Sequence, residues 1–259
     1  MTDTETASDI PAARPSSTVV LAREASGAPE LLMMRRNEKS SFGGAFAFPG
    51  GVLEEADRLV AGHCDGVTPE HADRLLGVEN ALDYFSGAIR ELFEESGALL
   101  ADVAAGGIDL DAIRGGLNRV DLRWDEFVID NEVRLHCAAL NYFSFWITPE
   151  ALPRRYSTRF FLAAMPEGQD ASHCGGEITE SRWITARDAL AAEREGSMLM
   201  HFPTVKTLES LAEQQTLDGL LRWAANCAMK GVPCIFPEIG KRGGEARVIV
   251  AGRDAGSLK

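Results

Sequence analysis

The amino-acid sequence predicts an α+β protein, an α/β/α sandwich around a mixed β-sheet with a C-terminal helical extension. Three observations support this prediction. β-Rich segments occur early and again in the middle of the chain, one amphipathic helix lies between them, and helical segments follow near the end. A chain of 259 residues can bury one substantial core with an extension. We therefore expect a single domain over residues 17–259, with the helical extension starting at about residue 203.

The first expected elements are a leader, a hairpin and a loop. Residues 1–16 are polar and contain no secretory-signal pattern, so we expect a disordered leader. The segments STVVLARE (17–24) and ELLMMRR (30–36) predict two strands joined by a turn. The glycines and the proline within residues 37–51 predict a long loop that enters a short strand.

A functional helix is expected in the middle of the chain. Thr68, Pro69 and Glu70 predict a short helix start. From about Asn80 to Ser96 the apolar residues recur at helical spacing, and Gly97 follows as a left-handed cap. Segments 133–148, 158–166 and 177–185 predict strands. Segments 186–195 and 203–228 predict helices, the second interrupted near 216–219, and 245–252 predicts a late strand.

Three carboxylates of the expected helix share one face. Glu91, Glu94 and Glu95 stand at i, i+3 and i+4, so they repel one another unless a cation lies among them. Hard divalent ions such as Mg²⁺ or Mn²⁺ prefer oxygen ligands of this kind. The alternative interpretation is a solvated acidic stripe, which is what most such clusters are. Arg90 precedes Glu94 by four residues and is placed to hold its carboxylate.

These residues resemble the Nudix hydrolase family, whose box reads G-x5-E-x7-R-E-U-x-E-E-x-G-U, with U an aliphatic residue. Gly51 matches the first glycine, Asp57 stands where the first glutamate is expected, and RELFEESGA (90–98) matches the second half. The seven-residue spacer is replaced by residues 58–89. We interpret residues 58–82 as an insertion that bulges from the surface, because lengthening a loop costs little entropy.

The resemblance implies roles for the box residues in a Nudix fold. Glu91, Glu94 and Glu95 would be metal ligands for Mg²⁺ or Mn²⁺, joined by the backbone carbonyl of Gly51. Asp57 and Arg90 would be structural supports.

The resemblance does not identify the residue that acts as general base. Glu91 is one candidate, and Glu177 and Glu180 are the others. For the last two, the alternative interpretation is an ordinary surface acid.

The split box is similar to the branch that includes the peroxisomal-type coenzyme A and acyl-coenzyme A diphosphatases. Arg35, Gly44 and the segment 48–51 fit the coenzyme A signature, whereas Ser40 stands where an arginine is expected. Arg35, Arg155 and Tyr156 are candidate substrate-binding residues. Arg155 and Tyr156 have the alternative role of pinning a loop to the sheet.

The resemblance thus implies a metal-dependent diphosphatase that uses water to cleave a nucleoside diphosphate derivative such as coenzyme A or acyl-coenzyme A. The alternatives are ADP-ribose, nucleotide sugars or dinucleotides as substrates, and a catalytically silent Nudix protein that senses a nucleotide.

Composition narrows the expected partners. A formal net charge of −13 disfavours nucleic-acid binding, and the most apolar stretch, 137–147, is too short to span a membrane. Five cysteines without a C-x-x-C pair, together with a C-terminus that lacks S-K-L, favour a cytoplasmic location. The expected partner is a small diphosphate, and the sequence leaves a homodimer open.

Overall fold

An eight-stranded mixed sheet forms the centre of the molecule. The computed structural model describes residues 10–38, 43–104, 107–173, 175–242, 245–250 and 253–257. The sheet has the order β10-β2-β1-β9-β8-β11, with β3 beside β2 and β4 beside β1. β1 pairs with β9, and β8 with β11, in parallel, whereas the other neighbours are antiparallel. The strands are β1 (Arg14–Arg23), β2 (Glu30–Arg36), β3 (Phe46–Ala47), β4 (Gly50–Val52), β8 (Asn141–Ile147), β9 (Tyr156–Ala164), β10 (Ile178–Thr185) and β11 (Cys234–Ile235).

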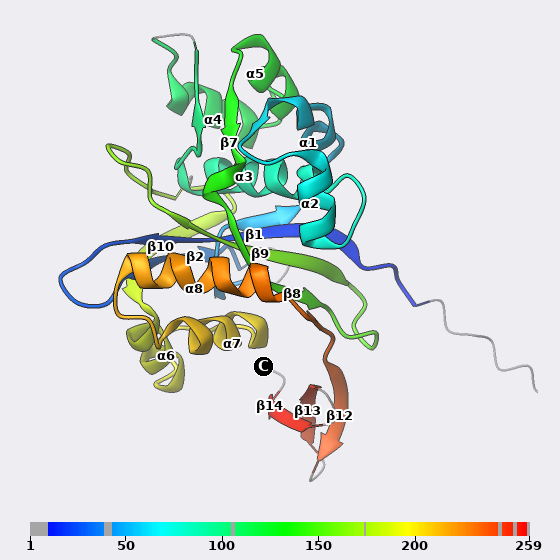
Figure 1. The fold of residues 1–259 in the computed structure, drawn as a ribbon. Coiled ribbons are helices and arrows are strands. Elements are labelled where there is room, and N and C mark those ends of the chain that lie inside the picture. The colour runs from blue at the N-terminus through cyan, green and yellow to red at the C-terminus, as the bar shows by residue number, and fades with distance from the viewer. Residues whose placement is uncertain are drawn as a thin grey trace, which may run out of the picture.

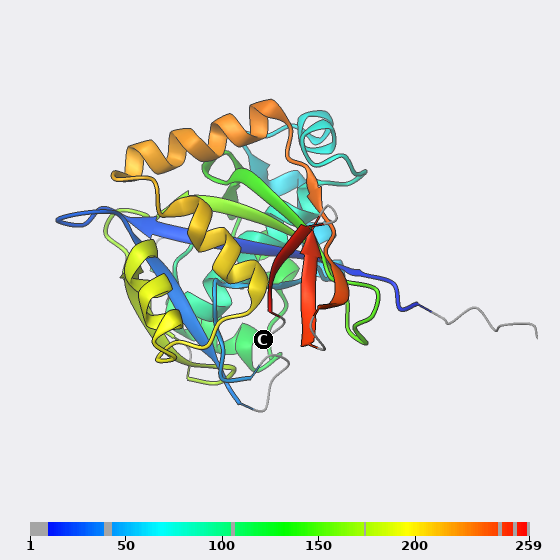
Figure 2. The same cartoon turned by 90° about the horizontal axis from the view of Figure 1, so that it is seen from below.

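Helices cover both faces of this sheet, as Figure 1 shows, and Figure 2 looks onto the layer of α6, α7 and α8. The opposite layer holds α1 to α5, so the predicted α/β/α sandwich with a mixed sheet is confirmed. The helices are α1 (Glu55–Leu59), α2 (Pro69–Leu76), α3 (Leu82–Ser96), α4 (Leu110–Asn118), α5 (Trp124–Asp130), α6 (Ala186–Arg194), α7 (Phe202–Leu211) and α8 (Leu217–Lys230). Two short 3₁₀ turns span Ala61–His63 and Cys137–Ala139.

Strand β1 is buried on both faces because apolar residues occupy both sides of its pleat. Val19 and Leu21 belong to the core beneath α3, whereas Val20 and Ala22 belong to the core beneath α6 to α8. Successive side chains of a strand point to opposite faces, so the run VVLA feeds both cores.

The expected boundary of the leader at residue 16 is wrong, because the sheet begins before it. β1 begins at Arg14, and Ser16 and Ser17 are buried where β1 pairs with β4 and β9. Pairing on both sides of β1 orders these polar residues, because their backbone groups are satisfied within the sheet. Residues 1–9 of the expected leader lie outside the described residues, as does Ser40.

The C-terminal extension is not only helical. After α8 the chain adds β11 to the central sheet and then forms an antiparallel sheet of β12 (Glu238–Arg242), β13 (Glu245–Val250) and β14 (Arg253–Ser257). The β-branched residues of β12 and β13 favour strands over helix. A further small sheet combines β5 (Cys64–Asp65), β6 (Ala101–Asp102) and β7 (Arg134–His136).

The inserted segment packs against α3 and does not bulge as an open loop. Val60, Ala72 and Leu76 are buried in the same core as α3, because the segment folds into α2, β5 and a 3₁₀ turn with apolar faces. Its two ends meet, since Arg58 Nε donates to Asp83 Oδ2 at 3.1 Å. Within the described residues, none of the helices has the length and apolarity needed to cross a membrane.

Candidate active site on helix α3

Helix α3 carries the acidic cluster and forms as its sequence predicts. Its apolar residues pack on the sheet, and it ends at Gly97, whose φ of 80° is left-handed. The Gly97 N–H donates to the Phe93 carbonyl at 2.8 Å. A residue with a side chain is strained at this φ, so glycine stops the helix directly after the acidic turn.

Arg90 joins the two separated halves of the motif. Its Nε donates to Asp57 Oδ1 at 2.9 Å, and Nη2 donates to Oδ2 at 3.1 Å. Nη1 lies 2.9 Å from Glu91 Oε1 and 3.2 Å from Glu94 Oε2. Arg90 and Asp57 are both buried, and Asp57 also accepts from the Glu54 N–H at 2.8 Å. The buried pair therefore fixes the start of α1 against the acidic turn of α3.

The glycine turn touches the same helix. The Gly50 N–H donates to Glu95 Oε2 at 3.1 Å, and a Cβ atom at Gly51 would overlap the carboxylate of Glu91. Only glycine at position 51 leaves room for that carboxylate beside the backbone. The insertion thus leaves the turn and the helix in contact.

Arg36 is a site residue that sequence reasoning missed. Its Nη2 donates to the Gly50 carbonyl at 2.7 Å and lies 3.3 Å from Glu95 Oε1, while Nη1 lies 2.5 Å from Glu177 Oε1. The predicted substrate-binding residue was its neighbour Arg35. Adjacent strand residues point to opposite faces, so alternation along β2 was the signal that separates the two arginines.

A cleft of about 360 Å³ opens beside these groups. Of the predicted residues, Gly51, Glu91, Glu95, Glu177 and Tyr156 line it. It is completed by Ser16, Thr18, Arg36, Gly50, Val52 and Thr158. The turn, the helix and the loop before β10 therefore meet at one cleft, which we call the carboxylate cleft.

Glu94, Asp57 and Arg90 lie outside the lining of this cleft, and so do three further predicted residues, Arg155, Arg35 and Glu180. Arg155 donates to the carbonyls of Thr148 and Pro11, at 3.2 and 2.7 Å, which is a loop-pinning arrangement. Arg35 lies 3.9 Å from Glu180, and Glu180 also pairs with Arg182 at 2.6 Å.

Burial raises the pKa values of the carboxylates in the acidic turn. It raises the pKa of Glu94 to about 7 and that of Glu95 to about 8, against the attraction of Arg90 and Arg36 respectively. Burial also raises the pKa of Glu91, again opposed by Arg90. Charged carboxylates cost free energy in such surroundings, and a bound cation offsets that cost.

The donor set fits Mg²⁺ or Mn²⁺ in chemical type. Three carboxylates and a glycine backbone carbonyl supply oxygen atoms of the kind that these ions prefer, and of these groups Glu91, Glu95 and Gly51 line the cleft. As the side chains lie, the described residues contain no group of three acidic, histidine or cysteine side chains converged on one ion position. Convergence of the three carboxylates on one ion would therefore require a change in their side-chain conformations.

Arg114 and Asn118 of α4 are further residues that the sequence did not reveal. Arg114 Nε donates to the Glu94 carbonyl at 3.0 Å, and Nη2 donates to the Glu95 carbonyl at 2.5 Å. Asn118 Nδ2 also donates to the Glu94 carbonyl, at 3.0 Å. These side chains donate to carbonyls at the end of α3 that have no partner within the helix, and no local sequence motif predicts such contacts.

Comparison with known proteins agrees with this architecture. The family model described as the NUDT19 Nudix domain matches residues 70–211, a little over half of the chain. The acyl-coenzyme A diphosphatase NUDT19 of Xenopus laevis is 26% identical over 251 residues, covering 75% of this chain and 66% of that protein. A relative from Caenorhabditis elegans, named "Putative nudix hydrolase 7", is 24% identical over 197 residues, which cover 73% of this chain. The chain thus spans 66% of the length of the Xenopus laevis protein and 57% of that of the Caenorhabditis elegans protein.

A solved structure shows the same fold. The crystal structure of a NUDIX hydrolase from Alicyclobacillus acidocaldarius superposes with a TM-score of 0.64 at 23% identity, covering 82% of this chain and 96% of that one. A mixed sheet between helical layers, with a glycine turn and an acidic helix at one cleft, defines the Nudix class. Within that class, the chain belongs to the NUDT19 Nudix domain family.

Proposed function

We propose that this protein hydrolyses the diphosphate linkage of a nucleoside diphosphate derivative, with coenzyme A or an acyl-coenzyme A as the first candidates. The observation that carries the proposal is the meeting of Glu91, Glu95, Gly51 and Arg36 at one cleft. Family membership and the activity in the name of the Xenopus laevis relative support the same reaction class.

The acidic turn is the proposed metal site. Glu91, Glu94 and Glu95 would hold Mg²⁺ or Mn²⁺ together with the carbonyl of Gly51. A bound ion of this kind offsets the charge on diphosphate oxygens and lowers the pKa of water. Arg90 would orient Glu91 and Glu94, since both carboxylates contact its Nη1, while Asp57 holds the guanidinium from the other side.

Arg36 and Tyr156 are the proposed substrate contacts. The Arg36 guanidinium lines the cleft beside Gly50, where a diphosphate can replace one of its carboxylate partners. Tyr156, at the start of β9, also lines the cleft. Arg35 and Arg155 are less favoured, because they lie outside the lining.

Glu177 is the favoured general base among the later acids. It lines the cleft with 56% of its side chain exposed, so it can reach water there. Glu180 is engaged by Arg182 outside the lining. Glu91 remains the alternative, because it also borders the cleft.

A substrate panel tests the proposal. Coenzyme A, an acyl-coenzyme A, ADP-ribose, a nucleotide sugar and a dinucleotide are incubated with Mg²⁺ or Mn²⁺, and the monophosphate products are measured. We expect metal-dependent cleavage that falls by at least about a hundredfold in Glu94→Gln. Glu79→Gln, which removes an equal charge at an exposed position, is the matched control. Equal activity in wild type and Glu94→Gln would refute the metal-site assignment, and binding without turnover would favour a nucleotide sensor.

A further inference from the structure

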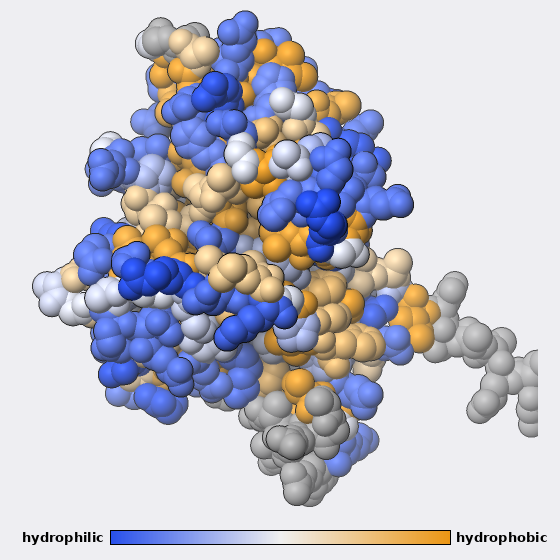
Figure 3. Space-filling view, viewed as in Figure 1, coloured by the Kyte–Doolittle hydropathy of each residue, from blue (hydrophilic) through white to orange (hydrophobic). Residues whose placement is uncertain are grey.

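A second concave surface lies on the α6–α8 side of the sheet. It is a groove of about 360 Å³ between β8, β11, α7 and α8, and we call it the aromatic groove. Its apolar walls include Phe143, Trp146, Phe202, Trp223, Ile235 and Val250. Figure 3 shows apolar surface in this part of the molecule, beside the end of α8.

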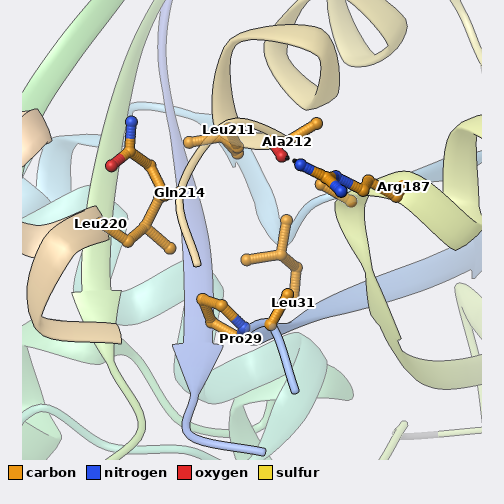
Figure 4. Close-up of a pocket in the computed structure, with 9 residues that line it drawn as sticks. Pro29, Leu31, Arg187, Leu211, Ala212, Gln214 and Leu220 are labelled. Atoms are coloured by element: carbon orange, nitrogen blue, oxygen red, sulfur yellow. Dashed lines mark hydrogen bonds between the residues drawn. The ribbon is translucent and has the colours of Figure 1, made fainter. Parts of the chain in front are cut away.

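Another pocket on the same side is too small to serve as a ligand site. Figure 4 shows it between Pro29 and Leu31 of the β1–β2 hairpin, Arg187 of α6 and the junction of α7 with α8. Its volume is about 10 Å³, and Arg187 Nε closes one side by donating to the Ala212 carbonyl at 3.0 Å. Such a space holds no more than about one water molecule.

The walls of the aromatic groove are held in place by ring packing. Trp146 and Phe202 meet edge to face with centroids 5.9 Å apart, and Phe143 lies 5.4 Å from Trp223. Trp146 is also fixed by its indole N–H, which donates to Ser144 Oγ at 3.0 Å. Aromatic pairs of this kind add stabilisation beyond area burial, so the groove is preformed.

Strand register makes the aromatic groove the neighbour of the carboxylate cleft. One row of paired residues crosses five strands, in the order Val52, Ser16, Thr158, Trp146 and Ile235. The first three line the carboxylate cleft and the last two line the aromatic groove. Paired residues point to the same face of a sheet, and adjacent strands lie about 5 Å apart. A ligand that fills the cleft is therefore one strand away from the groove.

The polar side chains of the groove lining are those of Ser144, Lys206, Thr207, Glu209 and Ser210. Thr207 is 3% exposed, it lines the groove, and its hydroxyl has no hydrogen-bond partner among the described residues. Lys206 and Glu209 form a salt bridge at the rim at 2.8 Å. A buried hydroxyl without a partner costs free energy, which a ligand atom can recover. A purine ring needs several such partners, whereas a hydrocarbon chain needs none.

We propose that the aromatic groove binds an apolar alkyl or acyl arm carried by the diphosphate substrate. The inference rests on the proposed function for the placement of the diphosphate in the carboxylate cleft. The groove then selects substrates by the length of the arm, with the Thr207 hydroxyl facing a polar atom of that arm.

A series of alkyl esters of ADP tests this inference. In the methyl, butyl and octyl esters, water adds across the anhydride to give AMP and the alkyl phosphate, so only the arm varies. We expect KM to fall by about two- to fourfold for each added methylene until the groove is full. Chain-length-independent KM with normal turnover would overturn the groove and leave the proposed function intact.

Two tryptophan substitutions locate the effect. Ser210→Trp adds bulk at an exposed position of the groove lining, and we expect it to reduce the octyl-to-methyl ratio of kcat/KM at least tenfold. Gln215→Trp is the matched control, because Gln215 is exposed between α7 and α8 outside the lining. If the folded Ser210→Trp protein keeps the wild-type octyl-to-methyl ratio of kcat/KM, the alkyl arm does not bind in the aromatic groove.

A binding measurement separates failure of the groove from failure of the hydrolase proposal. Methylene-bridged analogues of the methyl and octyl esters cannot be cleaved, and their binding is followed by tryptophan fluorescence. Tighter octyl binding that disappears in Ser210→Trp supports the groove even if no ester is hydrolysed, in which case only the hydrolase proposal fails. Equal binding of the two analogues overturns the groove.

Discussion

Replacing Asp57 by alanine is expected to destabilise the whole molecule. Asp57 is fully buried and meets the equally buried Arg90 through two hydrogen bonds, of 2.9 and 3.1 Å. The substitution leaves the Arg90 guanidinium partly unpaired. It also removes the acceptor of the Glu54 N–H, which donates to Asp57. Removing one partner of a buried pair costs about 3–5 kcal/mol. For a chain of this size, that loss lowers the midpoint of thermal unfolding by about 6–20 °C.

The assay is thermal unfolding of the metal-free protein, followed by circular dichroism. Asp121→Ala is the matched control, because Asp121 pairs with Arg119 at 2.8 Å while both side chains are about two-thirds exposed. Exposed pairs contribute about 0–1 kcal/mol, so the control should shift the midpoint by only a few degrees. If Asp57→Ala shifts it no more than Asp121→Ala does, the buried pair does not join the two halves of the site as we infer.

Three further outcomes follow from the same contacts. Gly51→Ala should lower kcat at least tenfold, because the added Cβ displaces the Glu91 carboxylate. Steady-state kinetics of the folded variant and of the wild type measure this change. Arg114→Ala should cost about 2–3 kcal/mol in urea unfolding and raise the metal concentration for half-maximal activity, since two carbonyls at the end of α3 lose a charged donor; unchanged values would contradict the capping role. The pKa values of Glu94 and Glu95 are raised from 4.5 to about 7 and about 8, so the folded state binds more protons than the unfolded state in that window. The free energy of unfolding without metal should therefore fall as pH rises from about 5 to about 8, and Mg²⁺ should raise the unfolding midpoint more at pH 8 than at pH 6.

The acidic helix was predictable because its signals are local. Its apolar spacing, its cap at Gly97 and the i, i+3, i+4 placement of three glutamates all lie within one segment, and each is present in the structure. The β1–β2 hairpin was predictable for the same reason, since turn residues separate two apolar runs. Contacts between Arg90 and Asp57 were accessible only through the family resemblance, because 32 residues separate the two positions.

The rest of the site depends on tertiary placement. Strand direction or the packing of distant elements places three residues at the site: Arg36, Arg114 and Thr158. The periodicity of the sequence predicts neither property. Arg155 illustrates the converse. Its charge suggested phosphate binding, yet the carbonyls of Thr148 and Pro11 use its donors.

The hydrogen bond between Arg58 and Asp83 has a consequence for how this chain tolerates change. It closes the inserted segment at its base, just beyond Asp57 and just inside the start of α3. The length and sequence of the chain between Arg58 and Asp83 can vary while Asp57 and Arg90 stay in contact. Both of these residues lie outside the part that varies. Such variation then alters the stability contributed by Val60, Ala72 and Leu76 more than it alters the chemistry. A reporter peptide grafted into this segment is therefore expected to lower the stability of the fold before it disturbs the carboxylate cleft.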